Sequence, residues 1–134
     1  MKFLLNALPH LGDAQAHCDI PCGIYTTEQA KTAAQTVKVM VEKIQNAGQD
    51  AHAVARFTSV KEQHAQLCEQ ELFILWGDFF KQEHLEKIPE LHAIMWRAVK
   101  LCSENKREIN VEKADQLCNA VQEVDTMFQQ CQSS

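Results

Sequence analysis

Apolar residues recur at helical spacing along most of the chain, and this periodicity limits its fold more than any other feature. The first such stretch follows Thr26 and ends near Gly48. Thr26, with Gln29 three residues later, is typical of a capping box at a helix start. No segment alternates apolar and polar residues as a half-buried strand does. The apolar positions of this first helix are Ala30, Ala33, Val37, Val41 and Ile44.

Three further helices are predicted in the same way. The second spans residues 53–82, the third opens at Pro89 and is broken by the polar segment 103–110, and the fourth is capped by Asn110 with Glu112 in its first turn. Four helices with narrow apolar faces and short connections predict an all-α, antiparallel up-and-down four-helix bundle over residues 26–131. The expected buried positions are Phe57, Val60, Leu67, Leu72, Leu75 and Phe79, then Leu91, Ile94, Ala98 and Leu101, then Ala114, Leu117, Val121, Val124 and Phe128.

Length and charge exclude several classes of protein. A chain of 134 residues has room for one domain with a single core. The formal net charge is −5 and no run of Lys and Arg stands out, so neither nucleic acid nor an anionic membrane is an expected partner. No stretch approaches the ~18 consecutive apolar residues that a membrane-spanning helix needs. We therefore expect a soluble protein.

Residues 1–16 precede the helical region and differ from it. Their short apolar piece is interrupted by Asn6 and stopped by Pro9, while the ending Ala14-Gln15-Ala16 resembles a signal-peptidase site. We predict that residues 1–16 form a cleavable leader. The interrupted apolar piece makes a secretory signal the less favoured kind of leader. The mature domain, 17–134, would then begin at His17.

Two of the six cysteines lie outside the helical patterns. Cys18 and Cys22 belong to the segment HCDIPCGIY at 17–25, which we call the hook. Pro21 restricts its backbone and Gly23 permits conformations that other residues resist, so the segment can curl. The four other cysteines fall on helices and are expected to be small, partly buried apolar groups. They are Cys68, Cys102, Cys118 and Cys131.

The hook carries metal-ligand chemistry. His17, Cys18 and Cys22 supply three side-chain ligands, one fewer than a structural zinc site wants, unless Asp19 or a histidine from the helices completes the set. Cleavage before His17 would add its α-amine and the amide nitrogen of Cys18 to the two thiolates. A planar set of two nitrogens and two sulfurs suits Ni(II) or Cu(II), and the His17 imidazole would be free to bind axially.

The hook resembles that of the nickel-containing superoxide dismutases. The segments KEQ at 61–63, LWGDFFK at 75–81 and HLEKIPELH at 84–92 extend the resemblance over nearly all of residues 17–130. The resemblance implies an enzyme that dismutates superoxide to dioxygen and hydrogen peroxide with one nickel ion per chain. It implies His17, Cys18 and Cys22 as metal ligands and Tyr25 as a catalytic residue over the open face of the metal.

The resemblance also implies residues around the metal and an assembly. Asp19, Pro21, His64 and Phe79 would surround the ligands. The better-known branch of the family has an acidic residue and an arginine where this chain has Ala33 and His64, so we expect a different support for His17, His64 itself being a candidate. A second tyrosine is replaced by Phe79. The resemblance further implies a homohexamer in the cytoplasm. It also implies a leader-processing protease that removes the leader from each chain.

Two other functions compete with this interpretation. One is a bundle that binds or delivers nickel or copper without turnover, which the altered surroundings of His17 make conceivable. The other is a secreted helical domain with a Cys18–Cys22 disulfide and no metal. Of the remaining residues, His52, His84 and His92 are expected at the surface or in structural roles. Trp76, Trp96, Phe79 and Phe80 are expected in core or subunit contacts.

Overall fold

The computed structural model describes residues 23–132, and these residues are mainly helical, without strands. The expected all-α class is confirmed. None of the helices in this part of the chain combines the length and apolarity needed to cross a membrane. The elements are α2 (Glu28–Asn46), α3 (Ala51–Ile74), the short π-helix η1 (Leu75–Phe79), α4 (Gln82–Lys87), α5 (Leu91–Arg107) and α6 (Val111–Gln132).

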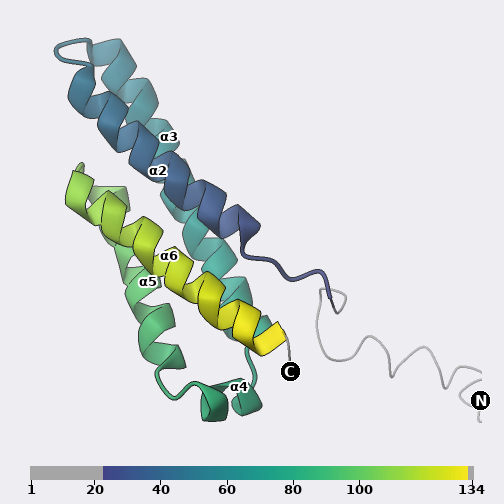
Figure 1. Cartoon of the computed structure of the whole chain (residues 1–134). Helices are drawn as coiled ribbons and strands as arrows, with labels where there is room; N and C mark the ends of the chain where they lie inside the picture. Colours follow the sequence, from purple (N-terminus) through teal and green to yellow (C-terminus); the bar gives the residue numbers. More distant parts are fainter. Residues whose placement is uncertain (1–22, 133–134) are drawn as a thin grey trace, which may run out of the picture.

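Four long helices surround one core (Figure 1). Consecutive long helices run in opposite directions, and α2 and α5 each pack against both α3 and α6. The short α4 lies at one end of the bundle, between the end of α3 and the start of α5. The start of α2 and the end of α6 face this same end, so segments far apart in sequence meet there.

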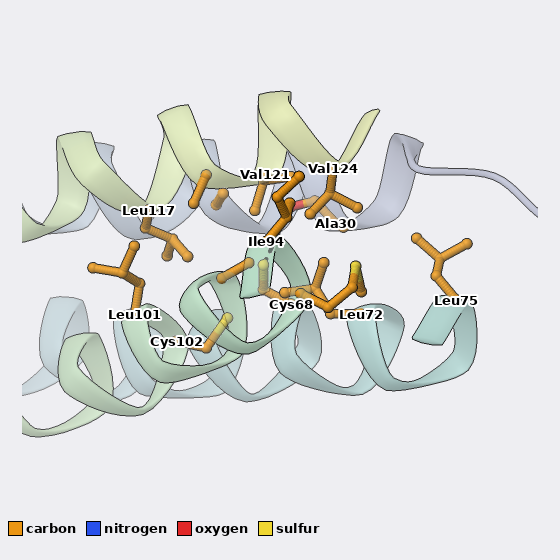
Figure 2. Close-up of a cluster of buried hydrophobic side chains, with 14 of the residues drawn as sticks. Ala30, Cys68, Leu72, Leu75, Ile94, Leu101, Cys102, Leu117, Val121 and Val124 are labelled. Atoms are coloured by element: carbon orange, nitrogen blue, oxygen red, sulfur yellow. Dashed lines mark hydrogen bonds between the residues drawn. The ribbon is translucent and has the colours of Figure 1, made fainter. Parts of the chain in front are cut away.

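The core follows the predicted apolar faces of three helices. Every predicted position of α2, α5 and α6 is buried, and Figure 2 shows side chains from these helices meeting those of α3. The prediction for α3 was partly wrong, because Leu67 is 39% exposed. Besides Leu72, which was predicted, the face that α3 buries carries two small residues and one lysine, which hydrophobicity alone does not select. Its buried residues are Lys61, Ala65, Cys68 and Leu72.

The predicted helix boundaries differ from the observed ones at several places. The second helix does not continue to residue 82, because Phe80 takes an extended conformation after η1. The third runs through the polar segment to Arg107. The fourth is capped as expected, with Lys113 N donating to Asn110 Oδ1 at 3.1 Å. The first begins at Glu28, whose N–H donates to Thr26 Oγ1 at 3.1 Å, so Thr27 rather than Thr26 occupies the N-cap position.

The bundle cysteines are free thiols in or near the core, as predicted. Cys68 Sγ donates to Ala30 O and Cys118 Sγ donates to Ala34 O, each at 3.5 Å, and both bonds join α2 to a neighbouring helix. Burial raises the pKa of the Cys118 and Cys131 thiols. The interaction with Cys102, together with burial, raises the pKa of Cys68. These thiols therefore have little of the thiolate character that reactive cysteines need.

Lys61 on α3 caps the end of α5 by hydrogen bonding, a contact that we call the Lys61 clasp. Its side chain is 1% exposed, and its Nζ donates to the carbonyl oxygens of Asn105, of Lys106 at 3.1 Å and of Glu108 at 2.9 Å. The last carbonyls of a helix lack partners within it, and a cation there also opposes the helix dipole favourably. Burial lowers the pKa of Lys61, and the Glu62 carboxylate acts in the opposite direction. The first residue of the KEQ segment thus joins two helices.

We predict that Lys61→Met lowers the free energy of unfolding by about 2 to 3 kcal/mol, because it removes charged hydrogen bonds while keeping most of the apolar stem. Urea denaturation measures this loss. The matched control is Lys38→Met, which removes an ion pair with Asp115 (2.9 Å) between partly exposed side chains and is expected to lower the free energy of unfolding far less than Lys61→Met does. Equal losses in the two variants would contradict the clasp.

Candidate functional site

The predicted site residues divide into two groups. His17, Cys18, Asp19, Pro21 and Cys22, like the expected leader, lie outside the described residues. Tyr25, Ala33, His64 and Phe79 lie inside them. Between residues 23 and 132, no three or more His, Cys, Asp or Glu side chains gather where they could hold a metal ion. The structure therefore describes only the last three residues of the hook, 23–25, which we call the base of the hook.

Tyr25 is seated where the start of α2 meets the end of α3. Gly23, two residues earlier, has a φ of +91°, a conformation that favours glycine. The Tyr25 ring is half-buried, and its centroid lies 5.6 Å from that of Phe79. A hollow of about 240 Å³ lies beside it. Its lining comes from the segment before α2, from the first turn of α2, and from the end of α3 with the start of η1: Ile24, Tyr25, Thr26, Gln29, Glu71, Ile74 and Leu75.

The π-helix η1 places Phe79. Phe80 N donates to Leu75 O at 2.9 Å, which is the five-residue hydrogen bond of a π-turn, and such turns are frequent at functional sites. The Phe79 ring then lies within 4.5 Å of the Phe128 ring and 5.1 Å of the Phe80 ring, measured between centroids. We call Tyr25, Phe79, Phe80, His84 and Phe128 the aromatic cluster. It joins the base of the hook to η1, α4 and α6.

His84 is part of this cluster, although the sequence assigned it only a surface or structural role. Its ring is stacked on Phe79, with centroids 5.5 Å apart and planes inclined by 17°. Its Nδ1 accepts a hydrogen bond from Lys81 N at 3.0 Å. The signal available in the sequence was its place five residues after Phe79, but nothing in helical periodicity indicates that the two rings meet.

His64 lies elsewhere on α3. Its Nδ1 is 2.9 Å from Val60 O of its own helix, and it precedes Ile74 by ten residues, or about 15 Å along the axis. Ala33 is 1% exposed and belongs to the core. Because Cys68 contacts Ala30 across the antiparallel pair, Ala33 and His64 lie at a similar height. The two positions that depart from the better-known branch of the resembled family thus lie at a similar height on neighbouring helices, away from Tyr25.

A buried carboxylate ties the start of α2 to α6. Asp125 accepts hydrogen bonds from Thr27 Oγ1, from Gln122 Nε2 at 3.3 Å and from Gln129 Nε2 at 3.4 Å, and Lys31 Nζ lies 3.6 Å away. Burial opposes ionisation of Asp125, but the hydrogen bonds, above all that from Thr27, and the charge of Lys31 outweigh it and lower the pKa. The chain is therefore anchored two residues after Tyr25.

Comparison with known proteins identifies close relatives. The family model described as nickel-containing superoxide dismutase matches residues 12–132. Over 113 residues, the chain is 39% identical to the superoxide dismutase [Ni] of Streptomyces seoulensis and 36% identical to that of Streptomyces coelicolor, which is 84% of this chain and 86% of each relative. A crystal structure of a Ni-containing superoxide dismutase, with nickel ligation of the oxidized state, superposes with a TM-score of 0.82 at 36% identity, covering 88% of this chain and 100% of the other.

The anchor at Asp125 can be tested with Thr27→Val. We expect this variant to lose about 1.5 to 3 kcal/mol of stability at neutral pH, the range for a hydrogen bond to a charged group. A lowered carboxyl pKa stabilises the fold above the ordinary value of 3.8, and this contribution disappears as the pH falls through the lower, folded value. The loss should therefore shrink in acid, as urea unfolding at several pH values would show.

The control is Thr32→Val, at an exposed position of the same helix, where no comparable loss is expected. A Thr27→Val loss that did not change between neutral and acidic pH would show that the carboxylate of Asp125 is not what Thr27 stabilises.

Proposed function

The chain belongs to the family of nickel-containing superoxide dismutases, and we propose that the hook at its N-terminal side is where the nickel is held. The reaction is the dismutation of superoxide to dioxygen and hydrogen peroxide, with nickel as cofactor. The single observation that carries the assignment to the hook is the match of the family over residues 12–132, which includes HCDIPCGIY. Of this segment, the structure describes residues 23–25, which lead into α2.

The donor set of the hook fits nickel. The α-amine of His17, the amide nitrogen of Cys18 and the thiolates of Cys18 and Cys22 would hold one ion per chain, with the His17 imidazole as a further ligand. When bound, nickel supplies one-electron oxidation and reduction by alternating between Ni(II) and Ni(III). Electron donation from two thiolates makes the higher state reachable. These ligands need deprotonated groups, so binding releases protons.

Tyr25 is proposed to limit access to the site and to order water there. It lies three positions after Cys22, so chain length keeps their Cα atoms within about 11 Å. The packing of Tyr25 against Phe79 supports a defined position for its phenol. Phe79 itself carries no hydroxyl, so its proposed part is to support Tyr25 by packing. Roles of Asp19 and Pro21 in ordering the hook, and of His64 toward His17, stay predictions.

Maturation, compartment and assembly complete the proposal. Removal of 1–16 by a leader-processing protease would free the His17 amine, and a solved relative matched over its full length by 88% of this chain supports a shorter mature form. The proposed site needs reduced thiols at Cys18 and Cys22, and a cytoplasmic location would keep them reduced. The homohexamer is proposed from the family alone, and exposed large apolar side chains are where its subunit contacts would be sought. They include Ile24 and Trp96, each 58% exposed.

The competing functions are less well supported. The named relatives are superoxide dismutases, which does not favour a carrier that binds nickel or copper without turnover. No observation on the described residues favours the secreted disulfide domain.

The proposal is tested with two preparations, one beginning at Met1 and one beginning at His17, each incubated with Ni(II). We expect only the His17 form to bind one nickel per chain and to consume superoxide catalytically, because only it has a free amine at the ligand position. Metal analysis and superoxide decay are the measurements. A Met1 form with the same nickel content and activity would contradict the free-amine site, and a nickel-loaded His17 form without turnover would favour the carrier.

A further inference from the structure

We propose that His84 is a positioning residue for Tyr25, acting through the Phe79 ring that lies between them. The proposal rests on the role suggested above for Tyr25, but its geometric part stands on described residues alone. His84 belongs to α4 and Tyr25 to the base of the hook, 59 positions earlier in the chain. Neither His84 nor Tyr25 is proposed as a metal ligand.

The His84 ring is held firmly. It is 7% exposed, and its Nδ1 accepts from the backbone N–H of Lys81, the residue that precedes the first turn of α4. A neutral imidazole that accepts at Nδ1 carries its proton on Nε2. The nearest acidic group to Nε2 is the Glu83 carboxylate, 3.9 Å away. The ring therefore has one preferred orientation at the start of α4.

The hydrogen bond to Lys81 alone does not require a histidine. A side chain at the third position of a helix commonly accepts from the N-cap backbone, and Glu or Gln usually does so. His84 adds a flat ring stacked on Phe79 at 5.5 Å, with Phe80 edge-on to it at 6.1 Å. A histidine can cap the helix and stack on Phe79 together, whereas Glu or Gln can only cap it.

A change at the His84 ring would affect the position of Tyr25 because Phe79 is packed between the two rings. Phe128 of α6 lies 4.5 Å from Phe79 and Tyr25 lies 5.6 Å from it, between centroids. Phe79 has no polar group, so its position depends on packing alone, and densely packed rings respond to a void beside them. Loss of the His84 ring would open such a void and let Phe79 move, and the Tyr25 ring would move with it.

The experiment uses the fact that Tyr25 is the single tyrosine of the chain. Full-length protein labelled with 3-fluorotyrosine gives one ¹⁹F resonance, recorded without nickel. We expect His84→Gln, which keeps a capping acceptor and removes the ring, to shift this resonance by more than its linewidth while far-UV circular dichroism stays unchanged. His92→Gln is the matched control, since His92 accepts from Trp76 Nε1 at 2.9 Å at the same end of the bundle. It should leave the resonance in place.

A double-variant comparison tests whether the coupling runs through Phe79. Phe79→Leu removes the ring that transmits the stack, and adding His84→Gln to it should then produce no further shift, because the coupling has lost its carrier. If His84→Gln leaves the Tyr25 resonance unmoved, or if its shift is the same with and without Phe79, the positioning role is overturned and His84 is only a helix cap.

A catalytic readout connects the geometry to the reaction. In the nickel-loaded form beginning at His17, His84→Gln should lower kcat by up to about a hundredfold, the loss that an ångström-scale misplacement can cause, with nickel content unchanged. A ¹⁹F shift with unchanged kcat would overturn the link between Tyr25 and turnover but not the positioning. An unmoved resonance would overturn the positioning whatever the activity.

Discussion

The packing of the Phe79 ring is the contact on which the candidate site depends. Tyr25 before α2, His84 of α4 and Phe128 of α6 all meet this one side chain, and the π-turn of η1 delivers it to them. A regular α-helix through residue 80 would rotate it away, because each residue turns the helix by about 100°. The π-turn that follows α3 therefore determines how Tyr25 packs at the base of the hook.

Two buried polar contacts hold the helices that carry this cluster. Asp125 fixes the first turn of α2 to α6, and Lys61 fixes the end of α5 to α3. Each is a charge taken out of water, which is costly unless hydrogen bonds replace the lost hydration. Several partners do so in both cases: all those of Lys61 lie at the end of α5, and those of Asp125 come from the start of α2 and from α6 itself. These contacts specify how the helices are placed relative to one another more strongly than apolar packing alone would.

The sequence predicted the helices whose burial follows a simple period and missed what depends on distant contacts. The faces of α2, α5 and α6 were recognisable from Val, Leu and Ile at helical spacing. Lys61 was not recognisable as buried, because its partners lie more than forty residues away. The break after Phe79 was missed because LWGDFFK is as apolar as a continuing helix. The hook ligands were predicted from donor chemistry and from resemblance, and they lie outside the described residues, whereas His84 could emerge only once the rings were placed.

The central claim is that the two thiolates of the hook, and none of the bundle thiols, bind the nickel. Nickel K-edge X-ray absorption on the form beginning at His17 tests it directly, with Cys18→Ser and Cys22→Ser set against Cys68→Ser and Cys102→Ser. We expect two sulfur scatterers per nickel, a number that stays the same when the bundle cysteines are replaced and falls with either hook substitution. Sulfur scattering that survived both hook substitutions, or a first shell of nitrogen and oxygen alone in the parent protein, would contradict it.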